Sequence, residues 1–254
     1  MNFQPVADNL RESFRIVAGS RREGELRELH GVSVASANVT FQMFNAAFLS
    51  TPVATETELT QRVLLANMHF ETRGLEWAWW MCDDWLEPKV RRRSRQLLER
   101  QGLRHTTSLP GMYAERLLPP QRLLPELEIR RVTACDSRGA FCEIGSVCFH
   151  VPLTWFREVF ENEVVWGNFA SYVGYADGEP VCTAAIVTGA GVLGVYNVAT
   201  LPGHQRKGYG EAVMRHAIDQ AGAGKIILQS TAAGLKLYER MGFRTITNVS
   251  VYAS

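Results

Sequence analysis

The segment most informative about the fold is VYNVATLPGHQRKGYG, residues 195–210, which is followed by a helical run over residues 211–221. It begins with apolar, β-prone residues, breaks at Pro202-Gly203 and continues as a loop with glycine at positions 208 and 210. The N-terminus of a helix leaves backbone N–H groups unpaired and carries partial positive charge, so a loop that brings an anion there needs glycine where a Cβ would block the approach. The pattern therefore predicts a strand, a turn, a phosphate-binding loop and a helix.

Spacing separates three phosphate-binding motifs that this loop could represent. A dinucleotide fingerprint needs glycine or alanine three residues after Gly210, where the chain has Val213, and a P-loop needs Gly-Lys-Ser/Thr, which is absent. The remaining candidate is QRKGYG, residues 205–210, which resembles the Q/R-x-x-G-x-G/A signature of the GCN5-related N-acetyltransferases, the GNAT family. On this motif alone, an ordinary turn before a surface helix stays open as an alternative.

The composition is that of an ordinary soluble globular protein, with 46% apolar and 21% charged residues. No apolar run approaches the roughly 18 residues of a membrane span and no apolar signal segment is visible, so we expect a cytoplasmic protein without a membrane partner. A net charge of +1 gives nucleic-acid binding no general electrostatic support, so we expect no nucleic-acid partner. The five cysteines form no C-x-x-C pair, which predicts neither a disulfide framework nor a metal site.

A proline-rich segment divides the chain. Residues 119–127 contain Pro119, Pro120 and Pro125 and are predicted to link an N-terminal domain, residues 1–118, to a C-terminal domain, residues 128–254. The C-terminal pattern predicts a strand, two helices, three strands, a helix, a strand, a helix and a strand. This is the order of the GNAT fold, so the resemblance implies an α/β (α+β) fold with a mixed central sheet and flanking helices.

The two halves of the chain repeat each other. Residues 96–104, QLLERQGLR, match residues 236–244, KLYERMGFR, at an offset of 140. The first half is thus similar to a partial, degenerate GNAT copy in a tandem arrangement. Where the second copy has its glycine loop, residues 50–56 contain no glycine and include Glu56, so we expect the first half not to bind a pyrophosphate and to serve as a structural wall.

Two local expectations also concern the first half. Residues 4–30 carry apolar and charged positions at helical spacing, which predicts two amphipathic helices. Residues 104–117 are predicted to form two short strands around Pro110-Gly111.

The resemblance implies a site for acetyl-CoA, the acyl donor of the family. In GNAT proteins the fourth strand splays from the fifth, and the gap admits the pantetheine arm, whose amides pair with the strand edge. The residues of this chain that match the strand edge are Val198, Ala199 and Thr200. The residues that match the pyrophosphate loop are Gln205, Arg206, Lys207, Gly208, Tyr209 and Gly210. The alternative, that Arg206 and Lys207 are only solvated loop charges, stays open.

Tyr238, in LYERMGF at residues 237–243, matches the position of the family's usual general acid. The resemblance implies that it gives a proton to the departing thiolate when a primary amine attacks the acetyl group directly. A phenol with a pKa near 10 is a weaker acid than a thiol with a pKa near 8.5, so a modest lowering of the phenol pKa would level this transfer. A tyrosine that only packs on a helix face is the alternative.

No general base is identified by the sequence. Many relatives carry a glutamate on the fourth strand, where this chain has Tyr196 and Asn197. The weak candidates elsewhere are each interpreted more simply as surface or packing residues: Glu143, His150 and Glu161. His204, in the loop, is interpreted as a structural residue or one close to phosphate.

Two functions are therefore compatible with the sequence. The first is an acetyl-CoA-dependent N-acetyltransferase that acts on a primary amine of a small molecule, a peptide or a protein. The second is a non-catalytic acyl-CoA-binding regulatory module. The sequence does not name the acceptor, and it is compatible with a monomer or a homodimer.

Overall fold

The computed structural model describes residues 2–160 and 162–254 and divides into two compact units. Unit 1 comprises the described residues up to Gly111 together with Ser230–Ala232 and Thr245–Ser254. Unit 2 comprises the described residues of Met112–Gln229 together with Ala233–Arg244. Residues 119–127 contain no helix or strand. The predicted domain bounds of 1–118 and 128–254 stay a prediction, because the compact units interleave along the chain.

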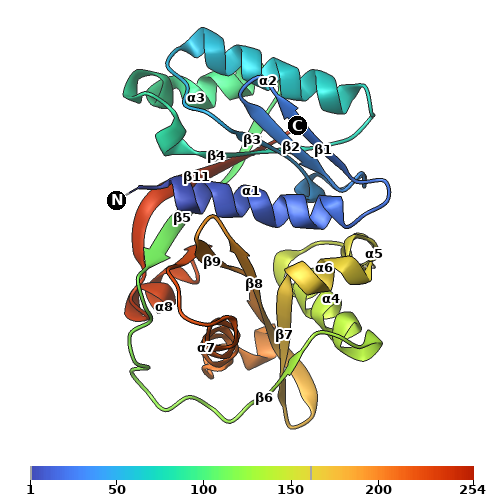
Figure 1. Ribbon diagram of the computed structural model, residues 1–254, viewed down its shortest axis with the longest axis vertical. Coiled ribbons are helices and arrows are strands. Elements are labelled where there is room, and N and C mark those ends of the chain that lie inside the picture. The colour runs from blue at the N-terminus through green and yellow to red at the C-terminus, as the bar shows by residue number, and fades with distance from the viewer. Residues whose placement is uncertain (1, 161) are drawn as a thin grey trace. The chain divides into compact units, whose positions relative to one another are not determined.

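The described residues of unit 1 form a mixed sheet with three α-helices (Figure 1). Its elements are α1 (Gln4–Gly19), β1 (Glu25–Leu29), β2 (Val32–Ser36), β3 (Asn45–Leu49), α2 (Glu56–Glu71), β4 (Ala78–Cys82), α3 (Pro88–Arg100), most of β5 (Arg104–Ala114) and nearly all of β11 (Arg244–Ala253). The strand order is β1-β2-β3-β4-β11-β5, in which β3 and β4 are parallel.

The structure corrects two expectations for this unit. The second predicted helix of residues 4–30 is the strand β1, because Gly31, with φ +71°, makes the tight turn that pairs β1 with β2. The region around Pro110-Gly111 does not divide β5. The Pro110 carbonyl accepts a 2.9 Å hydrogen bond from the Ser230 N–H, and Gly111 has no Cβ to clash with Thr247 Cγ2.

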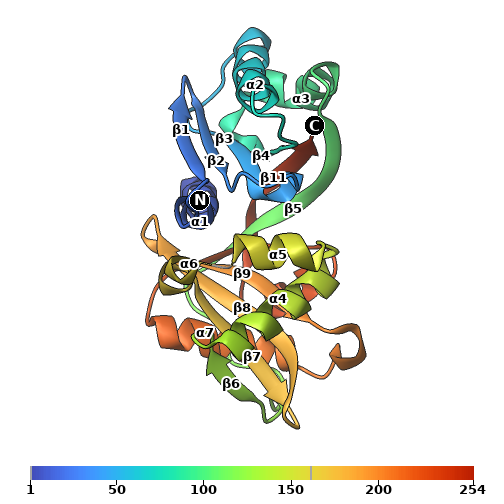
Figure 2. The same cartoon turned by 90° about the vertical axis from the view of Figure 1, so that its right-hand side faces the viewer.

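Unit 2 is a second mixed sheet with its own helices, and Figure 2 shows helices α4 and α7 beside its strands. Its elements are β6 (Glu128–Arg131), α4 (Cys135–Phe149), α5 (Leu153–Val159), α6 (Glu163–Asn168), β7 (Ala170–Ala176), β8 (Glu179–Gly189), β9 (Val192–Thr200), α7 (Tyr209–Ala221), β10 (Ile226–Gln229) and α8 (Leu235–Arg240). The strand order from the end of β5 is β5-β10-β9-β8-β7-β6.

The core of unit 2 fixes the position of β9 and its neighbours. Apolar side chains from the end of β5, from β7 to β10 and from α7 and α8 form one buried cluster, with Val213 and Met214 at 0% exposure. Burial of such side chains stabilises the fold by roughly 1.5–3 kcal/mol each. The strand β9 and the helices α7 and α8 are therefore held by a common core.

The predicted fold class is confirmed, since the structure is α/β with a mixed sheet and flanking helices. The repeat is visible in the element order, because β3-α2-β4-α3-β5 has the same sequence of strands and helices as β9-α7-β10-α8-β11. In both copies the first two strands are parallel. Within the residues that the structure describes, no helix is both long enough and apolar enough to cross a membrane.

Candidate functional site

The strand β9 separates from β10 partway along its length. Its parallel register with β10 ends at Val195, opposite Leu228, whereas its antiparallel pairing with β8 continues to Thr200, opposite Cys182. In the described register, residues 197–200 therefore have no strand partner on the β10 side. This is the splayed edge at which the sequence predicted Val198, Ala199 and Thr200.

A β-bulge lies at the start of this edge. Ala199 is the partner of Thr183 and Tyr196 is the partner of Ala185, so residues 197 and 198 together oppose one residue of β8. Asn197 has φ +49°, and its carbonyl accepts a 2.7 Å hydrogen bond from Thr183 Oγ1. A bulge bends the strand and increases its twist. The bulge therefore changes the direction of the β9 backbone just after the point where β9 separates from β10.

The loop after β9 ends in a helix N-terminus that no side chain caps. Gly208 is the N-cap of α7, has φ +97°, and makes no side-chain capping hydrogen bond. A Cβ on Gly210 would lie 3.1 Å from Thr200 Oγ1, and Gln205 Nε2 donates a 3.2 Å hydrogen bond to the Thr200 carbonyl. The first turn of α7 therefore lies beside the splayed edge and can accept an anion.

The corresponding helix of unit 1 has a closed N-terminus. Thr55 Oγ1 caps the helix by accepting a 3.1 Å hydrogen bond from the Glu58 N–H, and Glu58 Oε2 accepts one of 2.9 Å from the N–H of Ala54, the residue before the cap. The buried Arg62 guanidinium donates to the carbonyls of Thr51 and Pro52 and pairs with Glu58. The loop thus turns carbonyls toward a cation, which is the opposite polarity to an anion site.

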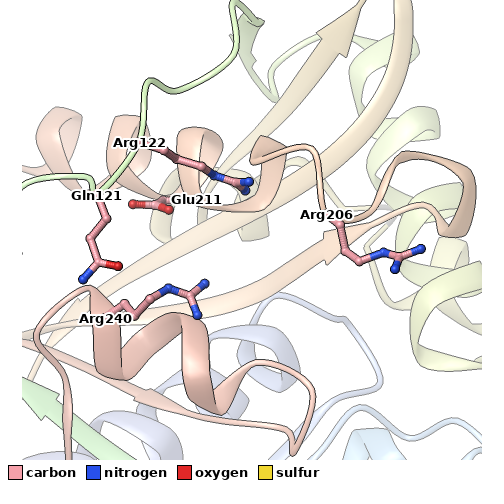
Figure 3. Close-up of a pocket in the computed structure, with 5 residues that line it drawn as sticks. All are labelled: Gln121, Arg122, Arg206, Glu211 and Arg240. Atoms are coloured by element: carbon pink, nitrogen blue, oxygen red, sulfur yellow. The ribbon is translucent and has the colours of Figure 1, made fainter.

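Five residues of unit 2 surround a cavity of about 450 Å³ beside the α7 N-terminus (Figure 3). They are Gln121, Arg122, Arg206, Glu211 and Arg240. The buried Glu211 carboxylate pairs with Arg215 at 2.8 Å, whereas none of the three lining arginines has an ion-pair partner within the described chain. The sequence predicted only Arg206. Glu211 directly follows the glycine motif and Arg240 lies on the helix of Tyr238, so their positions could have pointed to these two residues, whereas no motif marks Gln121 or Arg122.

Tyr238 lies on α8 in the shared core. It is 8% exposed, its ring packs edge-on against Phe243, and the side chains of Val198 and Tyr209 pack against the same cluster. Burial raises the pKa of Tyr238 to about 12. The phenol is therefore a neutral proton donor at pH 7. Burial disfavours the phenolate and so moves the Tyr238 pKa away from the lowering that would level proton transfer to the thiolate.

The structure shows the surroundings of the residues considered as general bases and of the strand position where many relatives carry a glutamate. Glu143 is exposed and pairs with Arg157 at 2.7 Å. His150 is an exposed residue that ends α4 with φ +56°. The Tyr196 ring contacts Phe169, with ring centroids 6.0 Å apart. Glu161 lies outside the described residues.

His204 lies in the short 3-10 helix after β9. The His204 ring lies beside the Tyr209 ring, and its buried Nδ1 atom has no hydrogen-bond partner in the described chain. Over residues 2–160 and 162–254, no group of three or more histidine, cysteine, aspartate or glutamate residues is arranged to hold a metal ion.

Substitution of Gly208 by alanine is expected to weaken acetyl-CoA binding by about tenfold and the folding free energy by about 1–2 kcal/mol. The reason is that a Cβ at φ +97° would meet Pro125 Cδ at 3.0 Å and Arg122 Nη2 at 3.3 Å. Calorimetric titration and denaturant unfolding measure the two effects. Gly178→Ala is the matched control, because Gly178 also has a positive φ but nothing lies within 4 Å of its added Cβ. Equal losses of acetyl-CoA affinity in both variants would exclude a role for the loop.

A model of a known protein family matches the part of the chain that carries this site. Residues 167–245 match the family model described as "Acetyltransferase (GNAT) domain". This range contains β9, the glycine loop, α7 and Tyr238. The chain therefore carries a GNAT acetyltransferase domain in its C-terminal half, as the motif predicted.

Solved structures extend the likeness of fold to the whole chain. A GCN5-related N-acetyltransferase from Kribbella flavida has a TM-score of 0.72 and 18% identity, covering 96% of this chain and 94% of its own. A GCN5-related N-acetyltransferase from Sphaerobacter thermophilus has a TM-score of 0.63 and 14% identity, with 88% and 76% covered. A putative GNAT-family acetyltransferase from Novosphingobium aromaticivorans has a TM-score of 0.57 and 14% identity, with 98% and 97% covered. The search of curated proteins found no match.

Proposed function

We propose that this protein is an N-acetyltransferase that moves an acetyl group from acetyl-CoA to a primary amine by direct attack. The observation that carries the proposal is the juxtaposition of the splayed β9 edge with the uncapped N-terminus of α7. A strand edge suits the amides of pantetheine, and an open helix N-terminus suits a pyrophosphate. GNAT proteins typically use acetyl-CoA, and this arrangement suits both parts of it.

The cofactor contacts follow from the same arrangement. The backbone of Val198, Ala199 and Thr200 would pair with the pantetheine amides, beyond the last β10 partner. The backbone N–H groups of residues 208–210 would bind the pyrophosphate, with Arg206 and Lys207 adding positive charge. The acetyl group would then lie toward the bulge at residues 197 and 198.

Tyr238 would assist the departure of the thiolate. The amine nitrogen attacks the thioester carbon, the C–S bond breaks, the nitrogen loses one proton and the sulfur gains one. Full transfer from a phenol of pKa about 12 to a thiolate whose acid has a pKa near 8.5 is uphill by roughly 5 kcal/mol. Tyr238 therefore donates a hydrogen bond to the sulfur and passes its proton on as it takes one from the substituted amine.

The amine itself must be uncharged when it attacks. Deprotonation of an alkylammonium at pH 7 opposes the reaction by roughly 4 kcal/mol. Since Glu143 is engaged by Arg157, we infer that water carries this proton to solvent. The same lack of an evident base is the observation that favours the second candidate, a non-catalytic acyl-CoA-binding module.

Release of free thiol in the presence of amines distinguishes the two candidates. Under either one, acetyl-CoA at 100 times its dissociation constant is expected to stabilise the fold by about 2.7 kcal/mol. Only the enzyme releases free CoA thiol in an amine-dependent reaction, which a thiol reagent detects across a panel of small amines, peptides and proteins. Stabilisation without thiol release from any amine would support the regulatory module, and no stabilisation at all would exclude both candidates.

A further inference from the structure

Two arginines of the cavity beside α7 are not needed for a pyrophosphate. Under the proposed function, on which this inference rests, the two negative charges of that group meet the α7 N–H groups, Arg206 and Lys207. Arg122 and Arg240 line the same cavity and have no ion-pair partner within the described residues. Two exposed, unpaired guanidinium groups that face one cavity indicate a second anionic group on the ligand.

The segment that carries Arg122 is held in place at both ends. At its start, the Leu118 N–H donates a 2.9 Å hydrogen bond to the Met241 carbonyl, just after α8, and a Cβ on Gly242 would lie 3.0 Å from Leu118 Cγ. At its end, a Cβ on Gly208 would lie 3.0 Å from Pro125 Cδ. Residues 118–125, which we name the strap, therefore run from the end of α8 to the phosphate loop.

The charges around the cavity favour an anion. Glu211, the one lining carboxylate, already pairs with Arg215, so Arg122, Arg206 and Arg240 leave the cavity strongly positive. Figure 3 shows the guanidinium groups of Arg122, from the strap, and Arg240, from α8, on either side of the same space. Gln121 adds an amide from the strap. The two cations thus come from separate segments and converge only in the folded chain.

We propose that Arg122 and Arg240 bind the 3′-phosphate of the CoA ribose, so that the strap is part of the cofactor site. Apart from its pyrophosphate, this phosphate is the only anionic group of CoA, and it carries close to two negative charges at neutral pH. A guanidinium binds a phosphate through two parallel hydrogen bonds, and two guanidiniums match its charge. The chain then selects CoA over dephospho-CoA, which has a hydroxyl at that position.

Calorimetric titration of the full chain with CoA and with dephospho-CoA tests the assignment. The wild-type chain is expected to bind CoA at least tenfold more tightly than dephospho-CoA. Arg122→Gln and Arg240→Gln are each expected to lower the affinity for CoA by roughly tenfold. Each should leave the affinity for dephospho-CoA within about twofold of the wild-type value, since only the 3′-phosphate contact is lost. Arg116→Gln is the matched control, because Arg116 is exposed, precedes the strap and does not line the cavity.

The outcomes separate this assignment from the proposed function. Equal affinity of the wild-type chain for both ligands, or equal losses for both in the two variants, would overturn the 3′-phosphate assignment and leave the acetyl-CoA site standing. Failure of both ligands to bind would overturn the assignment together with the proposed function. A loss in Arg116→Gln as large as that in Arg122→Gln would also overturn it, because the effect would then reflect net charge alone.

Discussion

Substitution of Tyr238 by phenylalanine is expected to lower kcat by about two to three orders of magnitude and to leave the affinity for acetyl-CoA within about twofold. Phenylalanine keeps the ring in the core beside Phe243 and removes only the hydroxyl group. The departing thiolate then loses its proton donor, whereas the strand edge and the phosphate loop are unchanged. Thiol release under saturating acetyl-CoA measures kcat, and calorimetry measures the affinity.

The control for this substitution is Tyr175→Phe. The Tyr175 ring lies 4.4 Å from the Arg130 guanidinium carbon, and phenylalanine retains that ring. We expect this variant to keep wild-type activity. Full activity in Tyr238→Phe would contradict the assigned role.

Because burial raises the pKa of Tyr238 to about 12, the wild-type kcat/KM is also expected to show no decline up to about pH 10.

Substitution of Arg62 by alanine is expected to lower the free energy of unfolding by about 3–5 kcal/mol. The 4% exposed Arg62 donates to the carbonyls of Thr51 and Pro52 and pairs with Glu58. Its removal leaves a carboxylate without its cation and two carbonyls without their donor. Denaturant unfolding, followed by a tryptophan fluorescence signal, measures the loss.

Arg92→Ala is the control for this effect. Arg92 is an exposed residue of α3 with no ion pair in the described part of the chain, so its loss is expected to change the stability by no more than about 0.5 kcal/mol. The affinity of Arg62→Ala for acetyl-CoA, measured below its unfolding transition, is expected to match that of the wild type. Equal stability of the two variants would contradict the stabilising role of Arg62 in the unit 1 loop.

The sequence alone predicted the parts of the fold that depend on local pattern. The strand, glycine loop and helix of residues 195–221 appear as β9 and α7, and the three consecutive strands predicted before that helix appear as β7, β8 and β9. Each of these segments has a hydrophobic period and a terminating glycine or proline that act within a few residues of one another.

Features that depend on distant partners were not predicted. The residues of β1 have a helical pattern, and only pairing with β2 makes them a strand. Arg122 acquires a site because Leu118 and Pro125 hold the strap against α8 and the loop, which no local pattern encodes. The pKa of Tyr238 depends on burial by the whole of its core, so a motif could suggest its role but not its acidity.

The proposed function requires one acetyl-CoA site per chain, in unit 2. Calorimetric titration of acetyl-CoA into the wild-type chain, Arg62→Ala and Gly208→Ala tests for this site. We expect one site per chain in the wild type, one site of equal affinity in Arg62→Ala, and about tenfold weaker binding in Gly208→Ala. Two sites per chain, or one site that Gly208→Ala leaves intact and Arg62→Ala removes, would contradict this expectation.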